Sequence, residues 1–146
     1  MRATSTAGAG GGRAWRAGAT PQAEQLLARA DGELVAAQFS AEPWEQFSHA
    51  HLAALRAAAA VVAARGRPGG RGAPRTVWGM LEQVAPELGV AARFFADGAA
   101  LRSAVDAGRF DQVDDDRAER TLVAAEDLVD AAREAVAHAP ALVRAS

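Results

Sequence analysis

The sequence predicts an all-α fold, a compact antiparallel bundle of four main helices plus one short helix. Three observations support this prediction. Apolar residues recur at three- and four-residue spacing, proline and glycine mark the ends of the periodic stretches, and no segment alternates as a strand does. With 146 residues the chain is long enough for one domain with a single core.

The helical domain is expected over residues 20–139. Residues 1–19 are rich in Gly, Ala, Thr and Arg, and they hold too little apolar surface to offset the entropy of ordering. They predict a disordered N-terminal tail, in which Trp15 stands alone. Residues 140–146 begin with Pro140, which ends the last helix, and they predict a short C-terminal tail.

Proline in the first turn marks the start of the first two helices. Thr20 is the expected N-cap of a helix that runs to about Gln38. The second helix begins near Pro43, and its sequence "FSHAHLAALRAAAAVVAAR" is apolar on several faces, which predicts a central, buried helix. Residues 66–75, "GRPGGRGAPR", contain four Gly and two Pro and predict a loop.

The second half of the domain contains three further elements. A helix is expected from Val77 to Gly98, with Pro86 kinking it or splitting it in two. A short helix follows over about residues 99–107. The last helix is expected to begin after Asp114, whose carboxylate can accept from the free backbone amides of the first turn.

The composition limits the class of protein. The net charge of −2 is not that of a polycation, and all 16 basic residues are Arg, beside 40 Ala. Such usage is typical of a high-GC genome, so Arg clusters indicate nucleic acid less strongly here. With no Cys, disulfides and thiolate metal sites are excluded. We find no apolar run long enough for a spanning helix and no signal peptide, and expect a cytoplasmic protein without a membrane partner.

Four stretches carry a resemblance to a known family. They are "LLARADGELVAAQ", "FSHAHLAALRAAAAVVAARGRP", "PRTVWGMLEQVAPELGVAARFFADGA" and "RTLVAAEDLVDAA". Together they cover about residues 22–137 and resemble the HEPN superfamily, more narrowly the actinobacterial SAV_6107-like HEPN family. The most individual stretch is the third, in which we expect Trp78 to be buried against the second helix.

The resemblance implies two classes of function. Many HEPN domains are metal-independent ribonucleases, in which an Arg and a His four to six residues apart act across a homodimer interface. The Arg neutralises the scissile phosphate and the His moves the proton. Other members lack this pair and bind nucleotides, nucleic acid or proteins. The resemblance also implies a homodimer and a DNA-repair or stress setting.

One pair matches the nuclease spacing, Arg133 and His138 in "REAVAH". Five helical steps place the two side chains about 140° apart around the axis, and an Arg-rich chain gives such matches by chance. Around Arg93, where the nucleases carry their motif, no His stands at Gly98, Ala99 or Ala100. We therefore expect no catalysis. The competing hypothesis is a ribonuclease that uses this pair, or Arg117 and Arg120 with a His from a partner chain.

The other titratable clusters do not predict a metal or cofactor site. His49 and His51 are two residues apart on a helix, about 200° around the axis, so one ion cannot bind both. Glu45 shares a face with His49, yet no third ligand is evident. The acidic run from Asp111 to Asp116 is typical of a helix start.

The candidate contact surface is the loop that carries Arg65, Arg67, Arg71 and Arg75. Four positive charges stand here without an acid, and glycine allows the backbone to approach a phosphate closely. We interpret the chain as a non-catalytic HEPN-like binding module that engages nucleic acid or a protein. A purely structural protein–protein interaction domain is the remaining alternative.

Overall fold

The computed structural model describes residues 20–139, and every regular element within them is helical. The elements are α1 (Pro21–Gln38), α2 (Pro43–Arg65), α3 (Val77–Val84), η1 (Pro86–Leu88), α4 (Gly89–Asp97), α5 (Ala99–Asp106), η2 (Phe110–Gln112) and α6 (Asp115–Ala137). The predicted all-α class is therefore confirmed. The predicted tails, residues 1–19 with Trp15 and residues 140–146, lie outside the described residues.

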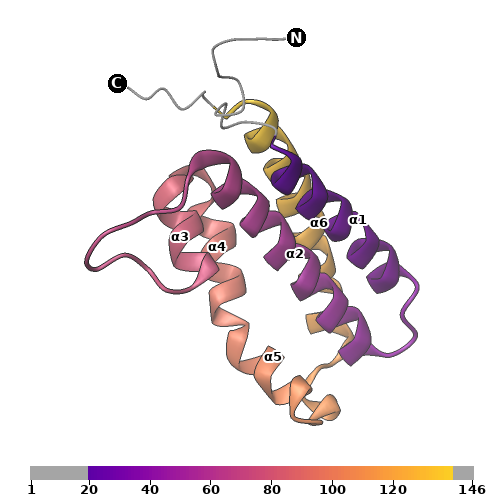
Figure 1. Cartoon of the computed structure of the whole chain (residues 1–146). Helices are drawn as coiled ribbons and strands as arrows, with labels where there is room; N and C mark the ends of the chain where they lie inside the picture. The colour runs from indigo at the N-terminus through magenta and orange to yellow at the C-terminus, as the bar shows by residue number, and fades with distance from the viewer. Residues whose placement is uncertain (1–19, 140–146) are drawn as a thin grey trace, which may run out of the picture.

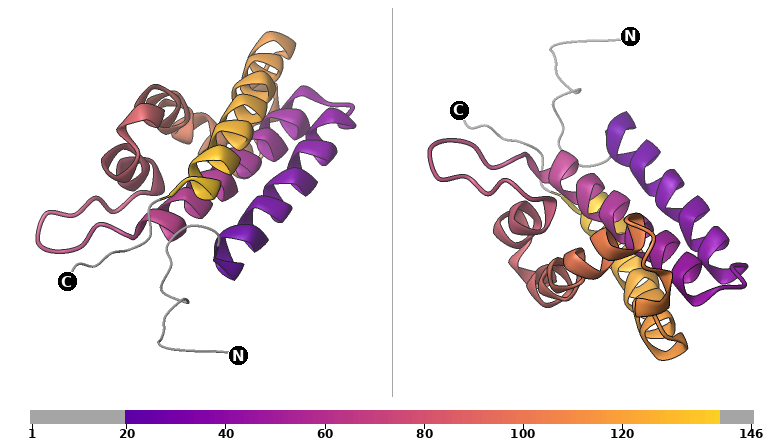
Figure 2. Two further views of the ribbon diagram at one scale, coloured as in Figure 1. Left: turned by 90° about the horizontal axis from the view of Figure 1, so that it is seen from above. Right: turned by 90° about the horizontal axis from the view of Figure 1, so that it is seen from below.

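Helix α2 lies at the centre of the bundle and packs most extensively against α1 and α6. Consecutive long elements run in opposite directions, so that α1 and the arm formed by α3, α4 and α5 run against α2 and α6 (Figure 1). The α3–α4 pair and α1 lie on opposite sides of the α2–α6 layer (Figure 2). The start of α1 and the ends of α2 and α6 thus meet at one end of the bundle.

Alanine allows α2 to pack closely on several sides at once. Its fully buried alanines are Ala50, Ala53, Ala54, Ala57, Ala58, Ala60 and Ala64. Small side chains permit short distances between helix axes, because the separation depends on the residues at the contact. Larger side chains from neighbouring helices, among them Leu27, Leu128 and Val129, fill the remaining space. The prediction of a central, buried second helix is confirmed.

One expectation about α2 needs correction. By length and composition α2 is long and apolar enough to cross a membrane, although no such stretch was expected from the sequence. Most of its apolar stretch is buried inside the bundle. A helix that is apolar on several faces is also what the centre of a helical bundle requires, and this position accounts for its composition.

The helix predicted after Thr76 is split at Pro86, as its sequence indicates. Helix α3 ends just before Ala85, whose backbone is not helical, with φ −141° and ψ 73°, and a 3₁₀ turn then leads into α4. Proline has no N–H to continue the helical hydrogen bonds of α3. The two halves still share one core, because Trp78 of α3 stacks on Phe95 of α4 with 5.3 Å between ring centroids.

The far end of the bundle has its own small core. Gly108, with φ 91°, turns the chain after α5, and the Asp114 carboxylate caps α6 by accepting from the Arg117 amide at 2.7 Å. Trp44 at the start of α2 stacks on Phe110 with 4.1 Å between ring centroids. The predicted cap is confirmed. Phe47 of α2 and Ala118 of α6 pack in the same small cluster, which joins the starts of these two helices.

Candidate functional site

The basic loop, residues 66–75, joins the end of α2 to the start of α3. Gly66, Gly70 and Gly72 have φ values of 97°, 89° and 82°, a backbone region that residues with a side chain rarely adopt. These glycines let the chain leave α2, turn and return within a few residues. The loop projects from the side of the bundle that carries α3 (Figure 1).

Arg65 differs from the other arginines of this region because its side chain is engaged. Its Nη1 donates to the Val84 carbonyl at 3.2 Å and lies 2.8 Å from Oε2 of Glu87. The backbone amide of Glu87 and the Arg65 guanidinium together hold the pKa of the Glu87 carboxyl below its usual range, against a smaller opposing effect of burial. Arg65 therefore ties the end of α2 to the α3–η1 junction.

Arg67, Arg71 and Arg75 are exposed, and no acid among the described residues forms an ion pair with them. Three guanidinium groups on one short loop produce a local positive potential that the net charge of the chain conceals. Planar guanidinium groups can hold phosphate oxygens through two parallel hydrogen bonds. This is the chemistry that the loop offers to a ligand.

A pocket of about 520 Å³ lies beside the loop, between the start of α1, the last turns of α2 and the start of α3. Its lining residues are Gln22, Leu26, Ala59, Val62, Ala63, Arg67, Arg75, Val77 and Met80. The lining is therefore apolar side chains, one amide and two guanidinium groups, without a carboxylate. Such a surface suits a ligand that combines an apolar body with negative charge.

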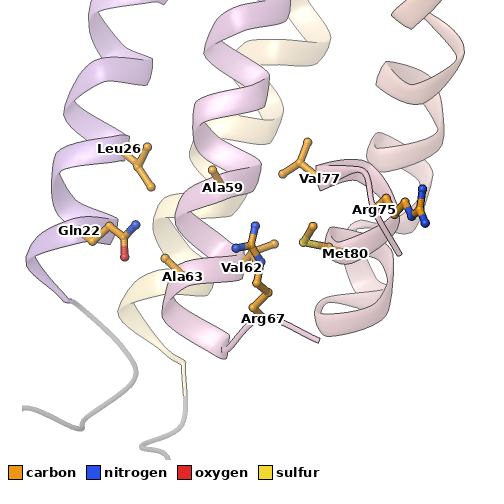
Figure 3. A pocket seen from close by; sticks show the side chains of 9 residues that line it. All are labelled: Gln22, Leu26, Ala59, Val62, Ala63, Arg67, Arg75, Val77 and Met80. Carbon is orange, nitrogen blue, oxygen red and sulfur yellow. The ribbon is translucent and has the colours of Figure 1, made fainter. Parts of the chain in front are cut away.

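Figure 3 shows how the two arginines lie around this pocket. The Arg67 side chain extends over the gap between α2 and α3, close to Val62 and facing Met80. Arg75 stands at the α3 edge, with its guanidinium turned outward. Gln22 extends from α1 on the opposite side. One cation thus covers the apolar floor and the second stands at the pocket's margin.

The structure does not bring Arg133 and His138 together. Nη2 of Arg133 lies 2.7 Å from Oδ1 of Asp31, so this guanidinium links α6 to α1. His138 caps the end of α6, where its Nδ1 lies 3.0 Å from the carbonyl oxygen of Glu134. Each side chain has a local structural partner, and each is exposed.

A different histidine, His51, lies beside an arginine, Arg117, and the sequence did not predict this proximity. His51 of α2 is buried, with ring centroids of Phe47, Trp78 and Phe95 within 5.8 Å of its own. Its Nε2 faces the Phe95 carbonyl at 3.4 Å and its Nδ1 is buried without a partner. Burial, with nearby Arg102 and Arg117, lowers the pKa of His51 to about 4 despite the opposing Phe95 carbonyl.

Arg117 closes this cluster from α6. Its Cζ lies 5.7 Å from the Phe47 ring centroid and 5.6 Å from that of Phe94. A Cβ built on Gly98 would lie 3.0 Å from Nη2 of Arg117 and 3.7 Å from Cδ2 of His51, so both side chains converge on this glycine. We call His51, Arg117 and the aromatic side chains around them the closed cluster; these are Phe47, Trp78, Phe94 and Phe95. Since the imidazole is neutral and enclosed by aromatic rings, RNA cannot reach it in this conformation.

The remaining histidines and acids form no metal site in residues 20–139. Nδ1 of His49 lies 2.7 Å from Oε1 of Glu33 on α1, so its partner is not Glu45. The acidic run from Asp111 leads into α6 and supplies its cap. No metal or cofactor chemistry is assigned to these residues.

A second hollow, of about 410 Å³, lies between α4 and α6 and is mostly apolar. Leu88, Val90 and Phe94 line it from one side and Leu128 from the other, and Val90 is 76% exposed. A hollow of this kind can receive a side chain of another protein. The homodimer stays a prediction, because the structure describes a single chain.

The described residues form an all-α helical-bundle domain that carries a basic loop. The model of the SAV_6107-like HEPN family matches residues 37–133, more than half of the chain, and the chain belongs to this family. A search of curated proteins and a search of solved structures found no match. HEPN domains are often nucleases or nucleotide-binding modules, so membership alone does not select the function.

Proposed function

We propose that the domain is a non-catalytic binding module that holds nucleic-acid phosphates on Arg67, Arg71 and Arg75. The observation that carries this proposal is the contrast between these three arginines and Arg65 and Arg133. The three are exposed and meet no acid within the described part of the chain, whereas the other two are each paired with a carboxylate. Unpaired guanidinium groups are free to replace the counterions of phosphates.

The proposal predicts how steeply the binding affinity falls as the salt concentration rises. Each phosphate neutralised on a single strand contributes about −0.7 to the slope of log K against log salt concentration. Three arginines, each holding one phosphate, give a slope of about −2. The slope counts the phosphate contacts, whatever bases the strand carries.

The test is fluorescence anisotropy of a short labelled single-stranded oligonucleotide, titrated with the protein at several salt concentrations. The triple variant Arg67→Ser, Arg71→Ser and Arg75→Ser is expected to lose binding and the salt dependence. The control variant Arg29→Ser, Arg109→Ser and Arg120→Ser replaces three exposed arginines elsewhere and so removes the same charge. Equal binding by the two variants would contradict the proposal.

A cleavage assay, read beside the titration, separates the two competing functions. Labelled RNA incubated with the protein in EDTA is expected to stay intact, because Arg133 and His138 have separate structural partners. If the RNA is cleaved, and if both Arg133→Ala and His138→Ala abolish the cleavage, the function is metal-independent catalysis and not binding alone. Absence of any salt-sensitive binding would favour a protein–protein interaction domain.

A further inference from the structure

We infer that the pocket beside the basic loop receives one unpaired nucleobase of a single strand, while Arg67 and Arg75 hold the phosphates next to it. This inference rests on the proposed function, because it requires phosphates at these arginines. It adds a site for the base and a preference for single strands over duplexes.

The first argument is the position of the pocket relative to the cations. Arg67 and Arg75 belong both to the basic loop and to the pocket lining; Arg67 extends over the pocket, and Arg75 stands at its margin with the guanidinium turned outward. A phosphate bound by Arg67 therefore lies at the mouth of the pocket. The base attached to that phosphate is then carried to the apolar floor formed by Leu26, Val62 and Val77. A ligand with only phosphate groups would leave this floor exposed to water.

The second argument is the chemistry of the groups that would face a base. Unstacked bases bind against guanidinium planes as well as aromatic rings, and Arg67 lies over the floor of the pocket. The Met80 thioether lines the same pocket, and sulfur packs favourably against aromatic rings. A flat base can therefore lie between the guanidinium plane and the apolar floor.

The third argument is Gln22, the polar side chain that the first turn of α1 adds to the lining. Its amide carries both a donor and an acceptor, as the edge of a base does. Figure 3 shows this amide extending from α1 toward α2. A base on the floor of the pocket can therefore be recognised at its edge as well as on its face.

Only an unpaired base can use this arrangement. The bases of a duplex are stacked and paired, and extracting one costs a few kcal/mol. A duplex can therefore reach Arg67 and Arg75 with its phosphates but cannot place a base in the pocket without that cost. Single strands should bind more tightly than duplexes of the same length.

The test compares three labelled probes of equal length: a single strand, its duplex and an abasic strand that keeps the sugar-phosphate backbone. The single strand is expected to bind on the order of tenfold more tightly than the abasic strand, as one stacked base contributes. DNA and RNA versions of the single strand are both measured, and a base-dependent affinity with either supports the inference.

The variant Ala59→Phe fills the pocket without removing a cation. We expect it to bind the single strand only as tightly as the abasic strand, with an unchanged salt slope. Ala100→Phe, at an exposed position of α5, is the matched control and should behave as the parent protein. Gln22→Ala, at an exposed position, tests the same pocket if the larger side chain disturbs folding.

The outcomes distinguish this inference from the proposed function. Equal, salt-dependent affinity for all three probes, unaffected by Ala59→Phe and Gln22→Ala, would overturn the base site and leave phosphate binding intact. No affinity for any probe would overturn both. Tighter binding of the single strand that Ala59→Phe removes would support both.

Discussion

Two regions of this bundle place arginine beside apolar side chains, and they differ in access. In the closed cluster, Arg117 lies over two phenylalanine rings and His51 is enclosed by aromatic neighbours. At the pocket, Arg67 and Arg75 lie beside an apolar floor of similar chemical character but stand in solvent. The cation of the first region, Arg117, meets aromatic faces of the protein itself. The cations of the second have no such partner among the described residues.

Residue types alone therefore do not define a site in an Arg-rich chain. Arg117 lies over Phe47 and Phe94, and the rings of Phe47, Trp78 and Phe95 enclose the neighbouring His51. Cation–π contacts of this kind contribute to stability when they are desolvated. The pocket at the basic loop has two guanidinium groups and one amide in its lining and no histidine.

The largest expected effect comes from opening the closed cluster. Phe95→Ala removes a fully buried ring that stacks on Trp78, and we expect it to lower the free energy of unfolding by about 3–5 kcal/mol. Urea denaturation followed by circular dichroism measures this change. Phe39→Ala, at a ring that is 84% exposed, is the control and should change stability by less than about 0.5 kcal/mol. Similar losses for both would mean that the cluster is not the packed core described here.

The next effect is a pH dependence caused by His51. Its pKa of about 4 in the folded protein lies below the ordinary 6.5, so between these values the unfolded chain binds a proton that the folded chain does not. Stability should therefore fall as the pH falls, by about 2 kcal/mol between pH 7 and pH 5 from this group. Measurements of unfolding at the two pH values test this.

The variant His51→Phe should lose this component of the pH dependence, because no imidazole remains to be protonated. The Phe95 carbonyl keeps a partner in this variant, since it also accepts from the Gly98 amide at 3.1 Å. His138→Gln removes an exposed imidazole and should retain the difference between pH 7 and pH 5. An unchanged difference in His51→Phe would locate its source elsewhere.

A still smaller effect separates Arg65, at the end of α2, from the exposed arginines of the basic loop. Arg65→Met keeps an unbranched stem but loses the hydrogen bond to the Val84 carbonyl, and should cost about 1 kcal/mol of stability. The ion pair with Glu87 adds little, because that carboxylate is half exposed. Arg67→Met should change stability by less than about 0.5 kcal/mol while weakening nucleic-acid binding. Thermal unfolding of both variants tests this, and a reversed order would contradict our assignment of Arg65.

Local signals in the sequence predicted most of the fold. Thr20 does accept from the Ala23 amide at 3.1 Å, Asp114 caps α6, and Pro86 divides the third helix. Each of these depends on residues close together in the chain, where backbone geometry and missing donors dictate the outcome. Helix ends can therefore be predicted from the sequence without knowledge of the packing.

The candidate site was less predictable because it depends on contacts between distant residues. The sequence grouped Arg65 with the other loop arginines, since Glu87 lies far along the chain and only the α2–α3 packing brings it within 2.8 Å. His51 and Arg117 are likewise brought together by α2 and α6. A usable signal was present in the second case: His51 follows Phe47 by one helical turn, on a buried face.

The stacking of Trp78 on Phe95 also gives the molecule an optical reporter. The indole is buried and meets the His51 ring edge-on, with 5.8 Å between centroids, so its emission follows the integrity of the closed cluster. No aromatic residue lines the pocket at the basic loop. With Trp15 and Trp44 replaced by phenylalanine, fluorescence would record unfolding of the interior separately from any event at the loop.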